Sequence, residues 1–459
     1  MRFKGRCIAV ALLVAACAAG QQNQFLGSVP SGDRTQSPVA LTLREAIDRG
    51  LRTNLGLLIS DSASESARGR RMQALSALLP RVDAHVSQVE EQLNLATIGF
   101  DLKIPGVNIN NISGPFHYTD VRASAAWNVY DGPSRQRLRA AEEARRAAQL
   151  SVEDARDLVV QAAASGYLTI IADTSSVEAT RSQVETAQAL YERATDQQKA
   201  GTAAAIDVLR AQVEVKQQQQ RLLSRQDQLE KDKLALGRVI GLPDGQEFQL
   251  TETVPFAPLT TITLEEAIRK ALQQRSDYKG AQAQVRAAEA QVKAARAERQ
   301  PTGSINADYG DVGTTLTHSH GTFTVTATAS INLFNGGRIG GEVVDTSAAL
   351  KQRRDELADL GAEIGYQVRA TFLDVRTAAE QVTVAHDNLD LANQTLEQSR
   401  DRFNAGVTDN IEVIQAQESV ANANDAVILA LYAHNAAKAA LARNLGGAEQ
   451  SIRQLLEVK

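Results

Sequence analysis

Two acidic side chains stand at equivalent places in a sequence that repeats itself, and they are the first candidates for a functional site. Asp207 follows Gly201 and Glu412 follows Gly406, each where a long stretch without proline turns at a glycine. Carboxylates brought together at such a point raise the local field and favour cations or protonation. The alternative is structural, because an acid in the first turn of a helix is stabilised by the helix macrodipole. The sequence leaves both interpretations open.

A lipid attachment site is predicted at Cys17. Basic residues precede a short apolar run that ends in Val14-Ala15-Ala16-Cys17. A basic start, a short apolar stretch and small residues are typical of an export signal, and a small residue before a cysteine resembles a bacterial lipobox. We therefore expect a signal peptide over 1–17 with a lipid on Cys17. Ordinary signal cleavage nearby, with Cys17 incidental, is the alternative.

Other residue types that could do chemistry give weaker patterns. His318 and His320 could bind a metal, but two histidines without a nearby cysteine or acid are better explained as loop polarity. The glycine-rich segment 336–341 superficially resembles a dinucleotide loop, yet no βαβ unit surrounds it. We find no Ser/His/Asp, Cys/His or paired-carboxylate arrangement in the sequence. It predicts no enzyme, no cofactor and no metal site.

Composition narrows the class of protein. Aromatic residues make up 4% of the chain, and the formal net charge is −5. This composition suits helices packed through small side chains, and the lack of a basic excess argues against nucleic-acid binding. No stretch after the signal reaches the ~20 apolar residues of a membrane-spanning helix. A membrane crossing would therefore need a closed β-barrel.

The elements that position these residues occur twice. The segment 42–47 (Thr-Leu-Arg-Glu-Ala-Ile) recurs as 263–268 (Thr-Leu-Glu-Glu-Ala-Ile). Further on, Ala200-Gly201-Thr202 recurs as Ala405-Gly406-Val407, and the landmarks keep their order. A long internal duplication in a helical chain indicates a quasi-symmetric body built from two similar halves.

Each copy predicts a helix followed by a pair of strands. Thr42 and Thr263, each with a glutamate three residues later, begin capping boxes. Alternating apolar and polar residues then predict strand pairs within 81–130 and 303–334. Four strands cannot close a barrel, but three chains would supply twelve.

Loops and helix hairpins complete each copy. We expect loops over 88–117 and 310–322, the first of them enlarged. Stretches without proline over 134–199 and 338–404 predict helices of about 100 Å, at ~1.5 Å per residue. Each helix turns at a glycine and returns as a second helix. The predicted divisions are a signal peptide over 1–17, a polar tail over 18–40, a first repeat over 41–245 with a hairpin over 134–240, a linker over 246–261, and a second repeat over 262–459 with a hairpin over 338–446.

Three pairs of motifs carry a family resemblance. They are the helix starts at Thr42 and Thr263, the strand ends Asn128-Val129-Tyr130-Asp131-Gly132 and Asn332-Leu333-Phe334-Asn335-Gly336-Gly337-Arg338, and the hairpin tips over 199–212 and 404–417. In this order and duplicated, the motifs resemble the TolC-like outer-membrane efflux protein family, over about residues 39–456.

The resemblance implies a fold and an assembly. The fold class is mainly α with a small β part, and the assembly is a trimeric channel-tunnel. Each protomer would give four strands to a twelve-stranded transmembrane β-barrel, and two antiparallel helix hairpins to a long α-helical barrel. The resemblance also implies a place in the outer membrane of a Gram-negative-type bacterium, extending into the periplasm.

The function implied is that of an outer-membrane channel in a tripartite efflux or type I secretion system. Expected partners are two further copies, a periplasmic membrane-fusion adaptor, an inner-membrane pump of the RND or ABC type, and outer-membrane lipid. The alternative is a periplasmic coiled-coil adaptor or scaffold, which would also need long helix hairpins. Four alternating strands placed between helices favour the channel.

The resemblance also implies site residues at the hairpin tips. The residues expected to contact the adaptor are Gly201, Thr202, Ala203, Ala204, Gly406, Val407, Thr408 and Asp409. The structural alternative is that Gly201 and Gly406 only end helices.

A periplasmic gate is implied at Asp207, Glu412 and Gln415. The family places two acids one turn apart in its second copy, whereas this chain has Glu412 and then Gln415, so the acidic ring would be weaker. The family archetype also locks its gate with an Arg from the second tip against an Asp of the first. The matching residues are Thr408 and Asp207, so this lock is expected to be absent.

Overall fold

The structure is a computed structural model, and helices make up most of the chain that it describes. It describes residues 25–99, 112–201, 204–252, 256–258, 262–315, 317–405, 407–408 and 410–456. The helices are α2 (Leu43–Thr53), α3 (Leu55–Ser76), η1 (Leu95–Ile98), α4 (Gly132–Lys199), α5 (Ala205–Val239), α6 (Leu264–Gln274), α7 (Ser276–Ala297), α8 (Arg338–Asn404), α9 (Asn410–Leu445) and α10 (Ala448–Leu456). The strands are β1 (Val39–Leu41), β2 (Arg81–Asn94), β3 (Ile112–Tyr130), β4 (Phe248–Leu250), β5 (Thr302–Thr315) and β6 (His318–Ser330).

These elements belong to two compact units. One, the hairpin unit, comprises the described parts of Met1–Ser64, Ala148–Gly280 and Leu357–Lys459. The other, the sheet unit, comprises the described parts of Glu65–Ala147 and Ala281–Glu356.

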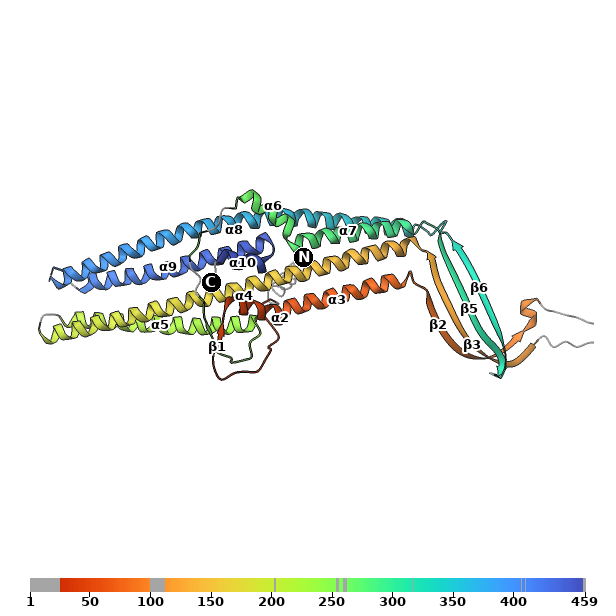
Figure 1. Cartoon of the computed structure of the whole chain (residues 1–459), viewed down its shortest axis with the longest axis horizontal. Helices are drawn as coiled ribbons and strands as arrows, with labels where there is room; N and C mark the ends of the chain where they lie inside the picture. Colours follow the sequence, from red (N-terminus) through yellow and green to blue (C-terminus); the bar gives the residue numbers. More distant parts are fainter. Residues whose placement is uncertain are drawn as a thin grey trace, which may run out of the picture. The chain divides into compact units, whose positions relative to one another are not determined.

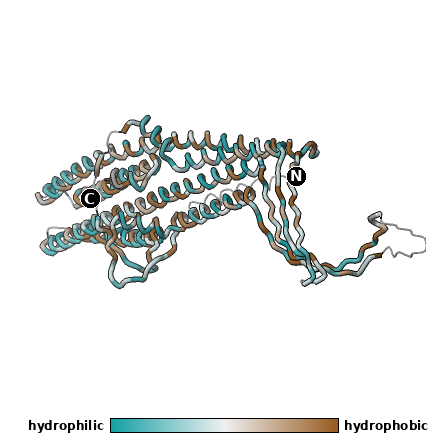
Figure 2. The backbone as a smooth tube through the Cα atoms, turned by 45° about the vertical axis from the view of Figure 1, so that its right-hand side comes forward, coloured by the Kyte–Doolittle hydropathy of each residue, from teal (hydrophilic) through white to brown (hydrophobic). Residues whose placement is uncertain are grey.

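The sheet unit contains one antiparallel sheet in the order β2-β3-β5-β6 (Figure 1). The outer pairs are the two predicted strand pairs, and β3 with β5 joins the two copies of the repeat. Apolar and polar residues alternate along the strands (Figure 2), and large apolar side chains such as Val82 (72%) and Phe323 (75%) are exposed. The prediction of four two-faced strands is confirmed.

The predicted loops over 88–117 and 310–322 are too long, because the strands continue into them. In the first copy β2 runs to Asn94 and pairs with β3 as far as Ile112. In the second copy Gly310 pairs with Thr322, and the ladder continues to Thr315 opposite His318. The residues of these segments still form backbone pairs between strands. The sequence there lacks the alternation of apolar and polar residues, so the pattern did not predict these parts of the strands.

The predicted first helix of each copy is two helices instead of one. The chain is extended at Asn54, between α2 and α3, and again at Arg275, between α6 and α7. The capping boxes at Thr42 and Thr263 are confirmed, since each hydroxyl accepts a hydrogen bond from the backbone of the glutamate and each glutamate accepts one in return.

Each break packs against the glycine that follows a hairpin. Gly241 has a φ of +67°, and a Cβ there would touch Thr53 Oγ1 and lie 2.7 Å from Thr53 Cβ. Gly446 has a φ of +83°, and a Cβ there would lie 2.9 Å from the backbone nitrogen of Arg275. Only glycine combines a left-handed conformation with so close an approach. The two breaks are therefore built in the same way.

The two hairpins are α4 with α5 and α8 with α9, and the helices predicted over 134–199 and 338–404 are confirmed. In the hairpin unit α9 lies beside α8 (Figure 1), and it contacts both helices of the first hairpin, α4 and α5. The Thr169 hydroxyl of α4 donates to Tyr432 of α9 at 3.3 Å. Arg225 Nη2 of α5 donates to Asp425 Oδ2 of α9 at 3.0 Å, so α9 contacts the other three hairpin helices.

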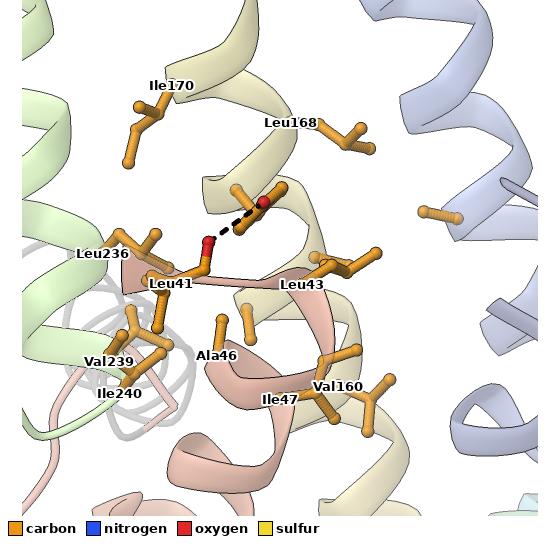
Figure 3. Packing of buried hydrophobic residues seen from close by; sticks show 14 of the residues in the cluster. Leu41, Leu43, Ala46, Ile47, Val160, Leu168, Ile170, Leu236, Val239 and Ile240 are labelled. Atoms are coloured by element: carbon orange, nitrogen blue, oxygen red, sulfur yellow. Dashed lines mark hydrogen bonds between the residues drawn. The ribbon is translucent and has the colours of Figure 1, made fainter. Parts of the chain in front are cut away.

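The main hydrophobic core lies where β1 and α2 meet α4 and α5. Figure 3 shows the buried side chains Leu41, Leu43, Ala46, Ile47, Val160, Leu168, Ile170, Leu236, Val239 and Ile240. The strand β1 pairs in parallel with β4, so the end of the predicted tail 18–40 is tied to the predicted linker 246–261. The sequence pattern predicted neither strand, and it did not predict α10. Among the helices of the described residues, none has the length and apolar composition of a membrane-spanning segment.

Candidate functional site

The first hairpin tip joins α4 to α5 through a left-handed glycine. Gly201 has a φ of +76°, and its N–H donates to the carbonyl of Gln198 at 2.9 Å. Ala204 precedes α5 without a side-chain cap. The predicted contact residues Thr202 and Ala203 lie outside the described residues. The structure therefore gives Gly201 a role in ending α4, and contact with an adaptor stays a prediction.

The second tip joins α8 to α9. The N–H of Val407 donates to the carbonyl of Arg402 at 2.9 Å, which ends α8. The Val407 side chain is 69% exposed. The Thr408 hydroxyl donates to the Glu412 carboxylate. The predicted contact residues Gly406 and Asp409 lie outside the described residues.

The two gate acids each have a basic partner in their own hairpin. Asp207 Oδ1 lies 3.6 Å from Arg210 Nη1, and Glu412 Oε1 lies 3.5 Å from Arg402 Nε. A nearby guanidinium offsets much of the field that a carboxylate presents to a passing ion. The acid at each tip is thus partly neutralised locally.

The two residues that match the family lock, Thr408 and Asp207, each contact a residue of their own hairpin. Thr408 is engaged with Glu412, and Asp207 with Arg210. Sequence reasoning missed both arginines as partners. The spacing from Asp207 to Arg210 could have indicated the first pair, because residues three apart face each other on a helix.

A groove runs between α5 and α9 beside the tips. Its volume is about 470 Å³, and the residues that line it are Ile206, Leu209, Arg210, Val213, Glu214, Gln217, Ile411, Ile414, Gln415 and Glu418. The side chains of Ile206, Leu209 and Val213 are 50–56% exposed. The predicted gate residue Gln415 is thus an exposed residue of this groove. A groove lined by both apolar and polar side chains suits the side chains of a partner helix.

A buried group of charges lies at the other end of the second hairpin. Arg443 Nη2 of α9 lies 2.6 Å from Asp154 Oδ1 of α4. Burial raises the pKa of Asp154, although Arg443 acts in the opposite direction. Burial alone would raise the pKa of Asp277 as well, but hydrogen bonds and the charge of Arg275 outweigh it and hold that pKa below its usual value.

Asp157 fixes the start of α10. Its two carboxylate oxygens accept hydrogen bonds from the N–H groups of Gly447 at 3.2 Å and Ala448 at 2.8 Å. Burial raises the pKa of Asp157, while these two hydrogen bonds lower it in part. No sequence pattern predicts this contact, because α4 and α10 are far apart along the chain.

The predicted lipidation residue Cys17 lies outside the described residues. Within the described ranges no group of three or more His, Cys, Asp or Glu side chains could hold a metal ion.

Comparison with solved structures matches this fold. A membrane protein from Pseudomonas aeruginosa is 19% identical with a TM-score of 0.79, over 92% of this chain and 97% of that chain. The CmeC outer membrane channel of Campylobacter jejuni is 16% identical with a TM-score of 0.77, over 95% of each chain. The outer membrane protein VceC of Vibrio cholerae is 18% identical with a TM-score of 0.75, over 88% of this chain and 96% of that chain. The predicted fold class, mainly α with a small β part and an internal repeat, is confirmed.

Sequence comparison identifies the family. No curated protein matches the chain. A family model described as outer membrane efflux protein matches residues 47–242 and 267–447. The two matched segments fall in the two copies of the repeat and together cover more than half of the sequence. The chain therefore belongs to the outer membrane efflux protein family.

Proposed function

We propose that this chain is the outer-membrane channel of a tripartite efflux or type I secretion system. It acts as a passive duct, without catalysis, in the outer membrane of a Gram-negative-type bacterium, and its hairpins extend into the periplasm. The observation that carries the proposal is the four-stranded antiparallel sheet with exposed apolar side chains, formed equally by two copies that each bear a long hairpin. A periplasmic adaptor would instead carry compact β-rich domains flanking one hairpin.

We propose a homotrimer, because four strands per chain are too few to close a barrel and three chains give an even number within the known range. Exposed apolar side chains on α8 and α5 support assembly. On α8, Tyr366, Leu373, Val384 and Leu391 are 61–68% exposed. Their spacings of seven and eleven residues place them on one helix face. On α5, Leu223 and Leu234 are 68% and 67% exposed.

The stripes on α5 and α8 fit one another in successive copies. Leu223 and Leu234 are separated by the same number of residues as Leu373 and Val384. In copies that point the same way, α5 of one chain runs antiparallel to α8 of the next. At ~1.5 Å per residue along each helix, Leu223 would lie about 27 Å from the first tip, and Val384 would lie about 30 Å from the second. Such a head-to-tail contact generates a ring when the rotation closes.

The tips are the proposed docking site for the adaptor, and the adaptor would link the channel to an inner-membrane pump of the RND or ABC type. The contact residues are those predicted from the sequence, together with the groove between α5 and α9. Its apolar floor around Leu209 and Val213 would accept apolar side chains of an α-helical hairpin. The gate is proposed at Asp207, Glu412 and Gln415.

A lipid on Cys17 is proposed as an additional anchor in the outer membrane. Cys17→Ala is expected to abolish labelling with a radioactive fatty acid while the trimer still assembles. Labelling that persists in Cys17→Ala would contradict the assignment.

The channel function has a direct test. Purified protein added to planar lipid bilayers is expected to give discrete conductance steps, because the proposed trimer encloses a continuous aqueous path. A soluble monomer that gives no steps under the same conditions would overturn the proposal. A variant with an aspartate in the α8 stripe, Leu373→Asp, is the matched negative control, since it is expected to prevent assembly.

A further inference from the structure

A pocket lies beside the end of α5 that is farther from the tip. Its volume is about 700 Å³, and its walls come from three segments of the hairpin unit: the end of α5, the loop between α5 and β4, and the segment that precedes β1. The apolar residues that line it include Leu234, Leu242 and Pro243, and the acidic residues include Asp244 and Glu247. The pocket therefore combines apolar side chains with hydrogen-bond acceptors.

Hydrogen bonds between these segments give the pocket its shape. The N–H of Ser31 donates to the carbonyl of Gly241 at 3.0 Å, and the N–H of Thr35 donates to Gln246 Oε1 at 2.7 Å. A few residues further on, β1 pairs with β4. The segment before β1 is thus held against the loop after α5, and the pocket is already formed in the single chain.

The pocket borders the exposed apolar stripe of α5. Leu234, which is 67% exposed, belongs to the stripe and also lines the pocket. The segment before β1 and the loop after α5 lie on the side of α5 away from α8 (Figure 1, Figure 2). In a head-to-tail ring of copies that point the same way, this side of α5 meets α8 of the next copy.

On α8, one exposed aromatic side chain lies at the height of this pocket. Tyr366 is 68% exposed, and it stands seven residues from Leu373, which is opposite Leu234 in the proposed register. Seven residues are two turns of a helix, about 10 Å at ~1.5 Å per residue. The same distance along α5 from Leu234 leads past Val239, where α5 ends, to the loop that lines the pocket.

Tyrosine has the chemistry that this pocket accepts. Its ring buries a large apolar area, and its hydroxyl needs a hydrogen-bond partner once it is buried. Leu234 and Pro243 offer apolar contact to a ring, and the carboxylates of Asp244 and Glu247 can accept from a hydroxyl. Neither carboxylate forms an ion pair with a described residue, so both are available as acceptors.

We propose that Tyr366 of one copy inserts into this pocket of the next copy and joins the two chains. The inference rests on the proposed trimer, and it adds the loop between α5 and β4 and the segment before β1 to the contact between copies. The tyrosine ring packs on Leu234 and Pro243, and its hydroxyl donates to an acidic residue of the loop. Three such contacts join the copies of a trimer, and each pocket is filled by a neighbouring chain.

Photo-cross-linking of the assembled protein tests the proposal. Tyr366→p-benzoylphenylalanine is expected to link two copies on irradiation and to give dimers and trimers on denaturing gels. Mass spectrometry of these products is expected to place the link within 28–38 or 230–249. The matched control is Tyr432→p-benzoylphenylalanine, because the Tyr432 hydroxyl lies 3.3 Å from Thr169 Oγ1 of its own chain. This control is expected to give links within one chain only.

Two further variants separate the ring from the hydroxyl. Tyr366→Ala removes both groups, so the trimer is expected to dissociate at a lower temperature on gels run after heating. Tyr366→Phe keeps the ring, and a smaller decrease is expected. Leu429→Ala is the control, since Leu429 is similarly exposed (58%) but lies on α9, outside the proposed contact. It is expected to leave the dissociation temperature unchanged.

Two results would overturn the proposal. One is a cross-link from residue 366 that joins no second copy, or that maps to other segments or to lipid. The other is a Tyr366→Ala trimer that resists heat as well as the unsubstituted trimer. The cross-link needs no channel activity. A protein that shows the mapped cross-link but does not conduct would contradict the channel function and leave the contact supported, whereas a conducting protein without the cross-link would contradict the contact alone.

Discussion

Glu412 and Asp207 differ in how their own hairpins hold them. Glu412 lies between Arg402, on the preceding helix, and Thr408, in the turn. Asp207 has only Arg210, one turn further along the same helix, as an ion-pair partner within the described residues. Both pairs are at least partly exposed, and exposed pairs contribute little to stability. Their effect is therefore expected on ions at the tips more than on folding.

The Arg402–Glu412 pair predicts how divalent cations block the channel. In Arg402→Gln the Glu412 carboxylate loses its counter-charge, so block by Mg²⁺ from the periplasmic side is expected at lower concentrations. Glu412→Gln should have the opposite effect and require more Mg²⁺. Conductance in planar bilayers measures both, and Arg376→Gln, which removes an exposed arginine of α8 away from the tip, is the control. Equal block in all variants would remove Glu412 from the gate.

Asp157 predicts a pH-dependent hold on α10. Asp157→Ala removes the cap of α10, and loss of a helix cap costs about 1 kcal/mol. Faster hydrogen exchange is therefore expected in α10. Asp157→Asn keeps an acceptor oxygen and should retain part of this protection.

The raised pKa of Asp157 sets the sign of that dependence. Its contribution is greatest in acid, and it decreases as the pH rises through the folded-state pKa. Protection of α10 should thus fall with rising pH in the unsubstituted chain and change less in Asp157→Asn. A steeper fall in Asp157→Asn would contradict this account.

Single helices and strands show which parts of the fold the sequence could predict. The capping boxes at Thr42 and Thr263 are local, so a few residues are enough to identify them. The breaks at Asn54 and Arg275 are set by distant glycines, Gly241 and Gly446, and no nearby proline marks them. The parallel pairing of β1 with β4 likewise joins short segments far apart in sequence. Local patterns therefore predicted where helices start, but not where tertiary contacts interrupt them.

Gly446 lies so close to Arg275 that a single added methyl group at this residue is expected to destabilise the fold. Gly446→Ala would force a left-handed alanine, at roughly 1–2 kcal/mol, with its Cβ 2.9 Å from the backbone nitrogen of Arg275. A lower temperature of trimer dissociation is expected on gels run after heating. Gly237→Ala is the control, because the nearest atom to its Cβ would be 3.9 Å away and alanine favours the interior of a helix. Gly237→Ala should be neutral or stabilising.

The site was less predictable than the elements that carry it. The sequence placed Gly201, Val407 and Thr408 in turns between helices, where the structure also has them. It did not reveal the pairing of Glu412 with Arg402, because that contact depends on how α9 folds back beside α8. It also missed the pairing of Arg443 with Asp154, which lie on different helices and become neighbours only in the folded chain. Partners across helices need the three-dimensional packing.

The proposed contact between the exposed apolar stripes on α5 and α8 can be tested in the assembled trimer. A chain with Leu234→Cys and Leu373→Cys is expected to form disulfides between copies under mild oxidation, giving dimers and trimers on non-reducing gels. The reason is that the proposed register brings α5 of one copy against α8 of the next. Leu234→Cys combined with Leu429→Cys is the control, since Leu429 is similarly exposed (58%) but lies on α9, outside the proposed contact of α5 with α8. Cross-linking in the control alone would refute the register.

The sheet order leaves two different edges, β2 at one side and β6 at the other. An unpaired edge strand is a template for pairing with another chain, so each joint of a closed assembly would need β2 from one copy and β6 from its neighbour. A copy with a mutation that disrupts β6 still has an intact β2. It therefore pairs with a normal copy through β2, and the ring stays open at its β6. The consequence is genetic. Mutations that spoil one edge are expected to be dominant over the normal allele, whereas mutations that prevent synthesis of the chain are expected to be recessive.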